Sequence, residues 1–548
     1  MKKIQRTGGE LVVDTLCELG SENIFCVPGE SYLEVLNALY DVPNTIRVIS
    51  CRHEQGASNM AEAYGKLTGK PGICMVTRGP GACNAAIGVH TAFQDSTPMI
   101  LFIGQVNSHY LGREAFQEID YEKMFNPIAK VVEQISKVDD IVDAIARAHN
   151  IALSGRQGPV VLSIPEDILR DRYKSISVVN KITKNSPPSV GEMKKLEQLL
   201  KQSKKPVMML GGSGWSLESR LKITSFAESF NLPVCCSFRR HDLFDNNHKN
   251  FVGEMGISPN PELVSLVKYS DFFLVVGARL GEVTSQNYTL LGKKKQKLIH
   301  VYPEKSELGK VYTSDIAIHS TVDNFARAIS QFAPFDPGCW NTHTKKAREN
   351  YLAGRKPRFY RGLLDLGQVM AEIDKILGVD GVICVDAGNF SGWPQRFIPI
   401  GGKRRFLGPT SGAMGYGIPA AITAKTLFPD RVVIGCVGDG CFGMTGQEIS
   451  TAVKEGANII VVVFSNSMLG TIRYQQERRF PNRVIATEIR NPDYALVAKA
   501  SGAFGETIKR TEQFGPALER AITSNLPAVL DLQMDPDLIS TRENLKDL

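Results

Sequence analysis

The sequence has no hydrophobic run long enough to cross a membrane. The apolar stretch 459–464 is among its longest, whereas a membrane-spanning helix needs roughly 20 apolar residues. The opening residues, MKKIQRTGGELVVDTL, place Gly, Glu and Asp where a secretory signal needs an uninterrupted apolar segment. We therefore expect a cytoplasmic protein with no membrane partner.

Cysteine patterns that build disulfide frameworks or zinc sites are also absent. The 11 cysteines are an odd number, they form no CxxC pair, and only Cys235 and Cys236 are adjacent. In a reducing compartment such cysteines behave mostly as small hydrophobic side chains. We expect most of them to be buried and unpaired.

Charge of one sign is not concentrated in any part of the chain. The 64 Lys and Arg residues are interspersed with 57 Asp and Glu residues, and the net charge is +7. The sequence shows no repeated platform of aromatic and basic residues of the kind that binds single-stranded nucleic acid. This balance suits anionic small molecules and predicts no nucleic-acid partner.

What the sequence does contain is an alternation of short β-branched runs, helical segments and glycine turns. This pattern is typical of parallel sheets covered by helices, so we predict an α/β fold with doubly wound sheets. At roughly 150 residues per domain, the 548 residues suffice for three or four domains. Two connectors, 180–189 and 335–361, divide the chain into domains 1–179, 190–334 and 362–548.

The most informative segment covers residues 432–472. A predicted strand, 432–437, leads into Gly438-Asp439-Gly440, a helix is expected over 445–454, and the next strand, 459–464, ends at Ser465-Asn466. Open α/β sheets bind ligands at the carboxyl ends of their strands. A carboxylate, an amide and a main-chain carbonyl at that edge would suit Mg²⁺ held together with a diphosphate.

Taken alone, Asp-Gly is above all a turn dipeptide. However, GDG followed by 25 residues and Asn resembles the motif of thiamin diphosphate enzymes. The resemblance implies that Asp439, Asn466 and the main-chain carbonyl of Met468 bind the metal. Ser465 stands where many members have a first Asn, which is a mild departure.

A second match lies in RHEQGASNMAEAYGKLTGKPGICMVTRGPGACN, residues 52–84. A single Glu after a strand is typically a helix cap. In this context Glu54 resembles the activating glutamate of the family, and Asn84 lies in the accompanying GPGACN segment. That glutamate shares a proton with the aminopyrimidine ring of the cofactor, which in turn allows deprotonation of the thiazolium carbon.

Further matches surround these two. In SGAMGYGIPAA, Met414 stands where the family props the cofactor in its bent form, although a core methionine is the alternative. VDAGNFSGW differs from relatives that carry Gln-His where this chain has Asn389-Phe390. The chain resembles the acetolactate synthase-like group, with pyrimidine-binding, central and diphosphate-binding domains. The remaining predicted cofactor contacts are Ala387, Gly388, Gly412, Gly440, Cys441, Leu469, Gly470 and Thr471.

The same resemblance implies that four residues contribute to the substrate site. Phe116 and Gln117 lie in an acetolactate synthase-like segment and are expected to face the substrate. Gln475 occupies the position of a Trp that helps biosynthetic relatives select 2-oxobutanoate, and Glu30 stands where a small residue is usual. Because no His-His pair is present, carboligation of a 2-oxo acid with a carbonyl acceptor is favoured over simple decarboxylation.

The resemblance leaves several alternatives open. The activity could instead be a nonoxidative 2-oxo acid decarboxylase or a C–C lyase, or the protein could be a catalytically silent cofactor-binding regulatory protein. The central domain could hold FAD, with Arg279 matching a family arginine, or could serve only for packing, because Gly281-Glu282-Val283 and Tyr302 depart from the flavin pattern. In this family Glu54 of one subunit meets the diphosphate domain of another, which implies a homodimer or homotetramer.

Overall fold

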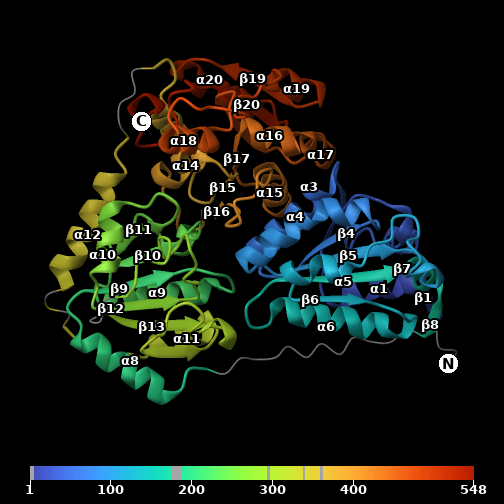
Figure 1. Ribbon diagram of the computed structural model, residues 1–548, viewed down its shortest axis with the longest axis horizontal. Helices are drawn as coiled ribbons and strands as arrows, with labels where there is room; N and C mark the ends of the chain where they lie inside the picture. Colours follow the sequence, from blue (N-terminus) through green and yellow to red (C-terminus); the bar gives the residue numbers. More distant parts are fainter. Residues whose placement is uncertain (1–4, 175–186, 293–295, 337, 339, 358–361) are drawn as a thin grey trace.

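The computed structural model describes residues 5–174, 187–292, 296–336, 338, 340–357 and 362–548. Three six-stranded parallel sheets, each covered by helices, follow one another along the chain (Figure 1). The predicted α/β class with three doubly wound sheets is therefore confirmed. Most of the first predicted connector, residues 180–186, lies outside the described residues.

The N-terminal domain contains the first six-stranded sheet, the helices around it and a separate antiparallel pair of short strands. Its strands and helices are β1 (Gln5–Thr7), α1 (Gly8–Glu18), β2 (Asn23–Cys26), α2 (Leu33–Tyr40), β3 (Arg47–Ser50), α3 (Glu54–Thr68), β4 (Gly72–Val76), α4 (Pro80–Asp95), β5 (Met99–Gln105), α5 (Tyr121–Phe125), β6 (Val131–Gln134), α6 (Ile141–Leu153), β7 (Pro159–Pro165), α7 (Glu166–Arg170) and β8 (Arg172–Lys174).

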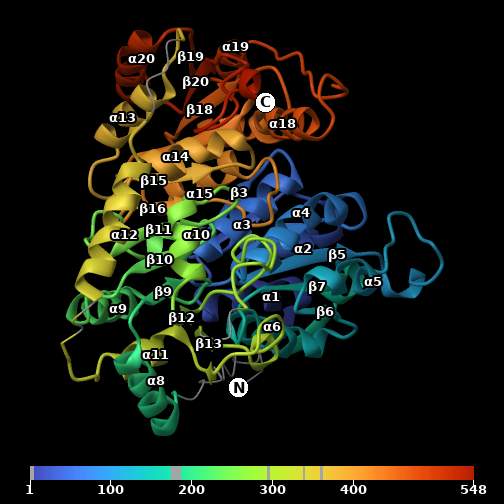
Figure 2. The same ribbon diagram turned by 60° about the vertical axis from the view of Figure 1, so that its left-hand side comes forward.

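The central sheet follows, and a long helix then leads toward the last domain (Figure 2). Its elements are α8 (Val190–Gln202), β9 (Pro206–Leu210), α9 (Leu217–Ser229), β10 (Val234–Ser237), β11 (Phe251–Met255), α10 (Pro261–Lys268), β12 (Phe272–Val276), β13 (Lys297–Tyr302), β14 (Ile316–His319), α11 (Val322–Ile329) and α12 (Trp340–Gly354). The second predicted connector, 335–361, thus contains a helix, because Trp340 buries its ring against the central core.

The C-terminal sheet completes the chain. Its elements are α13 (Leu366–Ile376), β15 (Val382–Val385), α14 (Gly392–Phe397), β16 (Arg405–Leu407), α15 (Gly417–Leu427), β17 (Val433–Gly438), α16 (Asp439–Thr445), α17 (Ile449–Glu455), β18 (Ile460–Ser465), α18 (Gly470–Arg479), α19 (Tyr494–Ala500), β19 (Phe504–Ile508), α20 (Thr511–Thr523) and β20 (Ala528–Gln533). The helix predicted over 445–454 is instead two short helices joined by the 3₁₀ turn Gly446–Glu448, and the first begins at Asp439.

The strand orders show that the first and last sheets are alike. The N-terminal sheet runs β3-β2-β4-β5-β7-β6 and the C-terminal sheet β16-β15-β17-β18-β20-β19, so both read 2-1-3-4-6-5 when strands are numbered in chain order. The central sheet, β11-β10-β9-β12-β13-β14, reads 3-2-1-4-5-6, the order of dinucleotide-binding folds. Ligands of such sheets bind where the strand order reverses, at β2/β4, β9/β12 and β15/β17.

The N- and C-terminal domains share a hydrophobic core. Met60 and Ala61 of α3 belong to the same buried cluster as Ile418 and Ala421 of α15, and all four are fully buried. The small residues of both helices let their backbones approach closely. Figure 1 shows α3 directly beside α15, so the first and third domains are packed together within one chain.

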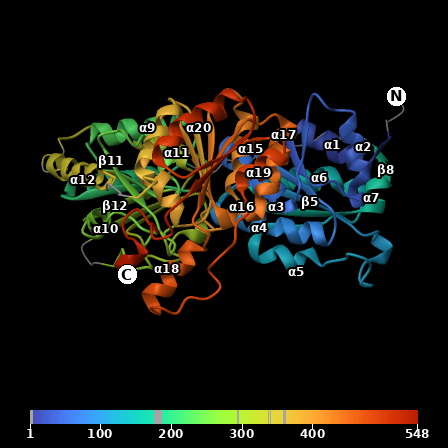
Figure 3. The same cartoon turned by 90° about the horizontal axis from the view of Figure 1, so that it is seen from above.

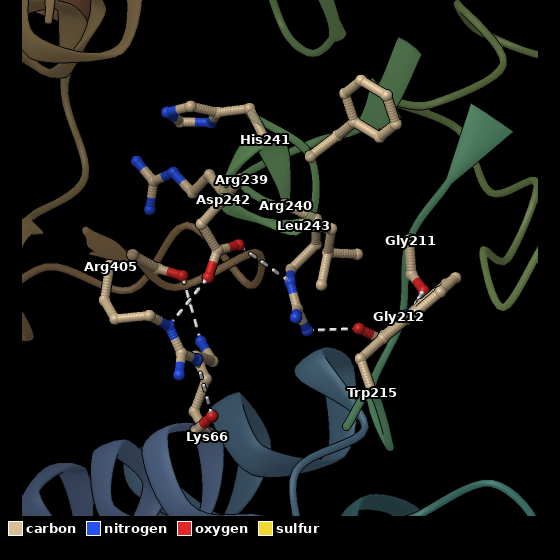
Figure 4. Close-up of polar contacts among 12 residues, drawn as sticks. Lys66, Gly211, Gly212, Trp215, Arg239, Arg240, His241, Asp242, Leu243 and Arg405 are labelled. Carbon is tan, nitrogen blue, oxygen red and sulfur yellow. Dashed lines mark hydrogen bonds and ion pairs between the residues drawn. The ribbon is translucent and has the colours of Figure 1, made fainter. Parts of the chain in front are cut away.

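All three domains meet at Asp242, in the 3₁₀ turn His241–Leu243 of the central domain (Figure 4). Its carboxylate lies 3.2 Å from Nε of Arg405 in the C-terminal domain and 3.5 Å from Nε of Arg240. Arg405 also donates to the main-chain oxygen of Lys66 in α3, at 3.4 Å. Burial alone would raise the pKa of Asp242, but the neighbouring arginines hold it below its usual value.

The expected state of the cysteines and the expected lack of a membrane-spanning helix can be compared with the structure. Eight of the ten cysteines in the described residues are buried, Cys17 is half-buried and Cys83 is exposed, and all ten are unpaired. No helix among the described residues combines the length and apolar character needed to traverse a bilayer.

Candidate active site

A cavity of about 520 Å³ lies at the carboxyl ends of β15, β17 and β18, between the C-terminal and central domains. This is the point where the C-terminal strand order reverses. Fourteen of the fifteen predicted cofactor contacts line it, and together they form its C-terminal wall: Ala387, Gly388, Asn389, Phe390, Gly412, Met414, Asp439, Gly440, Cys441, Asn466, Met468, Leu469, Gly470 and Thr471.

Asp439 is the buried carboxylate of this wall, with 3% of its surface exposed. Its Oδ2 accepts hydrogen bonds from the main-chain N–H groups of Asn466, at 3.0 Å, and Ser467, at 2.7 Å. The side chain of Asn491 donates to the same oxygen at 2.8 Å. These bonds fix the loop after β18 against the loop after β17, and so they bring the GDG turn and its distant Asn together.

Asp386, at the end of β15, organises two loops of the same wall. Its Oδ1 accepts from the N–H groups of Ala387, at 2.9 Å, and Gly415, at 2.8 Å, and its Oδ2 accepts from Gly417 at 2.8 Å. The side chain is fully buried, and burial raises its pKa although these three hydrogen bonds act in the opposite direction. Asp386 therefore joins the Ala387–Phe390 turn to the loop that carries Met414.

Phe390 lies beneath the glycine turns. Its ring stacks on Phe464 with centroids 5.5 Å apart, and a Cβ at Gly388 or Gly438 would collide with it. Glycine is therefore required at both turns for the backbone to lie this close to the ring. Met414 lies next to the GDG turn, because a Cβ at Gly440 would lie 3.2 Å from its terminal methyl group.

The opposite wall of the cavity comes from the central domain and the last residues of the chain. It includes Phe238, Arg239, Glu254 and Ile257, together with Arg542. Arg239 is buried and donates to the main-chain oxygens of Asp386, at 2.9 Å, and Pro409, at 2.6 Å. The two walls are thus connected directly behind the predicted cofactor contacts.

The predicted N-terminal residues gather at a different place, the carboxyl ends of β2, β3 and β4. Glu54 is the first residue of α3, and its Oε2 accepts a hydrogen bond from the side chain of Asn84 at 2.9 Å. Glu30 pairs with Arg78 at 3.0 Å. None of Glu54, Asn84 and Glu30 lines the cavity.

Two more predicted substrate residues lie on the loop after β5, which Figure 2 shows extending away from the body. Phe116 is 76% exposed. Gln117 has a positive φ of 66°, and its main chain contacts Gly79, where φ is 59° and a side chain would collide with Gln117. Gly79 in turn donates to the hydroxyl of Tyr121 at 2.9 Å, which fixes the loop to the end of β4.

Gln475 lies on α18, the helix that projects at the edge of the C-terminal domain in Figure 3. Gln475 itself is exposed, and α18 has no buried residue within the chain. Ile472 of this helix is 51% exposed, and Phe480, which follows it, is 60% exposed. An apolar surface of this kind next to a cavity is typical of a region that another surface covers.

The site contains residues that sequence reasoning missed. Asp386 follows a predicted strand within VDAGN, so its place at the sheet edge could have been read from the strand boundary. Asn491 lies 52 residues after Asp439, in a loop with no motif, and only the fold brings it near. Among the described residues no three His, Cys, Asp or Glu side chains are grouped as a metal site. A cation at Asp439 would therefore need neutral oxygens as its other ligands.

Comparison with known proteins gives three family matches along the chain. Residues 6–124 match the N-terminal TPP binding domain of thiamine pyrophosphate enzymes, residues 193–329 the central domain, and residues 386–532 the C-terminal TPP binding domain.

Curated relatives match over almost the full length. The chain is 30% identical to the acetolactate synthase large subunit of Corynebacterium glutamicum, over 97% of this chain and 87% of that protein. It is 29% identical to the acetolactate synthase large subunit of Haemophilus influenzae, over 98% and 95%. It is 30% identical to the acetolactate synthase of Mycobacterium leprae, over 97% and 88%.

Proposed function

Because this chain belongs to the family of thiamine pyrophosphate enzymes, we propose that it is an acetolactate synthase-like enzyme. It decarboxylates a 2-oxo acid and transfers the remaining acyl group to a second carbonyl compound. The observation that carries this proposal is the cavity at β15/β17, where fourteen predicted cofactor contacts lie together. The family matches, which cover parts of all three domains, support the same cofactor.

The residues of the C-terminal wall fit thiamin diphosphate. At Gly412 no atom lies within 4 Å of the place that a Cβ would take, so the main chain there can lie close to a bound ligand. Helix α18 begins at Gly470 without a side-chain cap, and a helix N-terminus of this kind favours a negatively charged diphosphate. Met414, which protrudes toward Gly440, would support the cofactor ring.

The same wall fits Mg²⁺. Asp439 supplies a carboxylate, Asn466 an amide oxygen, and Met468 a main-chain carbonyl, and hard oxygen ligands of this kind are those that Mg²⁺ prefers. The hydrogen bonds from Asn466, Ser467 and Asn491 occupy Oδ2 of Asp439, while Oδ1 accepts one from Gly440 at 2.8 Å. We propose that Oδ1 is the oxygen that binds the metal.

Thiamin diphosphate supplies a nucleophile for the 2-oxo group and an electron sink for decarboxylation. The protein contributes binding, orientation and proton transfer. Glu54 is the proposed acid–base group, and Asn84 holds its Oε2 in place, which leaves Oε1 to exchange a proton with the aminopyrimidine nitrogen.

We further propose a homodimer as the smallest active unit, with a tetramer as a second assembly. Glu54 and Asn84 do not line the cavity of their own chain, and α18 lacks buried residues. A second copy could bring its Glu54 face against the cavity and cover α18 in the same contact. Cyclic two-fold assemblies of this kind are the commonest among soluble homo-oligomers.

For the substrate, we propose that Phe116, Gln117, Glu30 and Gln475 face the acceptor in this assembly. The charge of Glu30 is balanced by Arg78 at 3.0 Å, so this acid does not repel a carboxylate as a lone charge would. Gln475 lacks the large apolar side chain of the Trp that biosynthetic relatives have at this position. This difference argues against strong selection of 2-oxobutanoate.

We propose that the central domain does not hold FAD. At the strand reversal β9/β12, Arg240 donates to the main-chain oxygen of Gly212, and Trp215 donates to that of Gly211 at 2.8 Å (Figure 4). Arg279 donates to the main-chain oxygen of Gln94 in α4. A dinucleotide would have to displace these side chains, so we expect purified protein without flavin absorbance near 450 nm.

The proposal is tested by incubating the protein with thiamin diphosphate, Mg²⁺ and a panel of 2-oxo acids, followed by mass spectrometry of the products. We expect CO₂ and a carboligation product such as acetolactate from pyruvate, and no turnover by the D439A variant. Acetaldehyde alone would indicate a nonoxidative decarboxylase. Absence of CO₂ from every substrate would contradict the proposal and favour a silent cofactor-binding protein.

A further inference from the structure

The start of helix α3, which presents Glu54, is tied to the C-terminal domain of the same chain by one buried carboxylate. The main-chain N–H of Arg52 donates to Glu448 at 3.1 Å to Oε1 and 3.2 Å to Oε2. The N–H of His53 donates to Oε1 at 3.0 Å. Glu448 therefore holds the main-chain N–H groups of the two residues that come directly before Glu54.

Glu448 is built into the segment that also carries the predicted metal ligand. It ends the 3₁₀ turn that links α16, which begins at Asp439, to α17. The side chain is fully buried, and Oε2 accepts a hydrogen bond from the hydroxyl of Thr451 at 2.6 Å. A side chain at Gly56 would collide with the carboxylate, so glycine at that position leaves room for it.

A second contact fixes the other side of Glu54. The side chain of Gln55 donates to the main-chain oxygen of Met414 at 2.9 Å, and the N–H of Gln55 donates to Nδ1 of His53 at 3.1 Å. The main chain around Glu54 is thus held on both sides by residues near the cavity wall. A carboxylate at this end of α3 also interacts favourably with the helix dipole.

We propose that Glu448 is a positioning residue for Glu54. It does not touch the reacting atoms; it fixes the main chain from which Glu54 extends, and so sets where the Glu54 carboxyl group lies. This inference rests on the proposed function, in which Glu54 is the acid–base group. Because small displacements of catalytic groups lower rates strongly, loosening this contact should lower kcat.

The chain offers a matched control in Glu455. This acid lies seven residues after Glu448, also joins the C-terminal to the N-terminal domain, and pairs with Arg47 at 2.8 Å. Arg47 begins strand β3, at the opposite end of that strand from Glu54. The E455A variant therefore removes a contact between the same domains without touching the start of α3.

We expect E448D, which keeps the charge but withdraws the oxygens by one methylene, to lower kcat about 10-fold or more. E448Q keeps an acceptor at the place of Oε1, and its kcat should stay within about 3-fold of the wild type. The Kd of thiamin diphosphate with Mg²⁺, followed by tryptophan fluorescence, to which Trp393 in the cavity contributes, should change less than about 3-fold in both variants. The E455A variant should retain the wild-type kcat.

Two measurements separate positioning from a general loss of structure. In an E54Q background, E448D should cause no further decrease in kcat, because its effect acts through Glu54. In the protein without cofactor, hydrogen exchange at residues 52–58 should be faster in E448D than in the wild type or in E455A.

The inference is overturned if E448D retains the wild-type kcat, or if its effect multiplies with that of E54Q. Equal losses in E448D and E455A would assign Glu448 a purely structural role and would also overturn it. Failure of the proposed function is recognised differently, since it would appear as unchanged turnover in E54Q itself.

Discussion

The first and last domains have the same strand order, yet they present their predicted site residues in opposite ways. At β15/β17 the central domain supplies a second wall, and the predicted contacts line a cavity between the two domains. At β2/β4 the side chain of Glu30 is 67% exposed and Phe116 is 76% exposed. The same sheet topology therefore gives one half-site that lies in a cavity between two domains, the cavity half-site, and another that lies on the surface, the exposed half-site.

The largest effect is expected in the cavity half-site. The D439A variant removes a carboxylate that lines the cavity and the hydrogen bonds that join two loops of its C-terminal wall. Turnover should fall by about 10³-fold or more, and binding of thiamin diphosphate with Mg²⁺ should be lost in calorimetry. D439A with nearly normal cofactor affinity would show that the cavity is not the diphosphate site.

The E54Q variant, in the exposed half-site, should lose turnover without a comparable loss of cofactor affinity. The amide removes the titrating proton but preserves the contact with Asn84, so kcat should fall by about 10²-fold or more. Cofactor affinity should change much less than in D439A. Steady-state kinetics and calorimetry check both quantities, and equal losses of affinity in the two variants would remove the distinction between the half-sites.

The contact between the N-terminal and C-terminal domains can be tested at the buried ion pair of Lys66 and Asp95. Lys66 of α3 pairs with Asp95, and Thr410 of the C-terminal domain donates to Asp95 through its N–H at 2.8 Å. Burial alone would raise the pKa of Asp95, but Lys66 and Thr410 hold it below its usual value. The stabilisation is therefore present above the unfolded pKa and is lost as the pH falls through the lower folded value.

We expect D95N to lower the free energy of unfolding by about 3–5 kcal/mol at neutral pH, because it leaves the buried charge of Lys66 without this partner. The difference in the free energy of unfolding between D95N and the wild type should become smaller as the pH falls. Thermal unfolding at several pH values measures it, with Asp120, an exposed acid paired with Lys123, as the control position for an Asp→Asn change. A difference that grows as the pH falls would contradict this account.

A smaller effect is expected from Gln475, at the edge of the exposed region. The Q475W variant adds a large apolar surface to α18, and it should increase the preference for 2-oxobutanoate over pyruvate as acceptor by about 3-fold to 10-fold. This preference is measured by letting the two acceptors compete and determining the product ratio by mass spectrometry. The exposed Arg479 on the same helix provides a control as R479W, which should leave the ratio unchanged.

The meeting of Asp439 and Asn466 at one sheet edge could be predicted from the sequence because the information is local. A GDG turn after one strand and an Asn after the next must meet at the edge of a parallel sheet, and Asp439 and Asn466 do so. The start of α3 at Glu54 also agrees with the expected strand and helix. Asn491, Arg239 and Glu448 could not be predicted in the same way, because their contacts join distant segments or different domains.

The boundaries of helices were less predictable than the strands. The buried apolar runs fixed β17 and β18 to within one residue of the expected ranges. The expected helix 445–454 is interrupted at Gly446–Glu448, where the chain turns so that Glu448 reaches the start of α3. A tertiary contact of this kind leaves no periodic signal in the sequence.

The most direct test of the account mixes two inactive variants, E54Q and D439A. If each site combines Glu54 of one copy with the cavity of another, mixed dimers hold one site with both residues intact, and the mixture should recover about a quarter of wild-type turnover. Native mass spectrometry verifies that mixed assemblies form. Mixed assemblies with no more activity than either variant alone would contradict the claim that the two half-sites come from different copies of the chain.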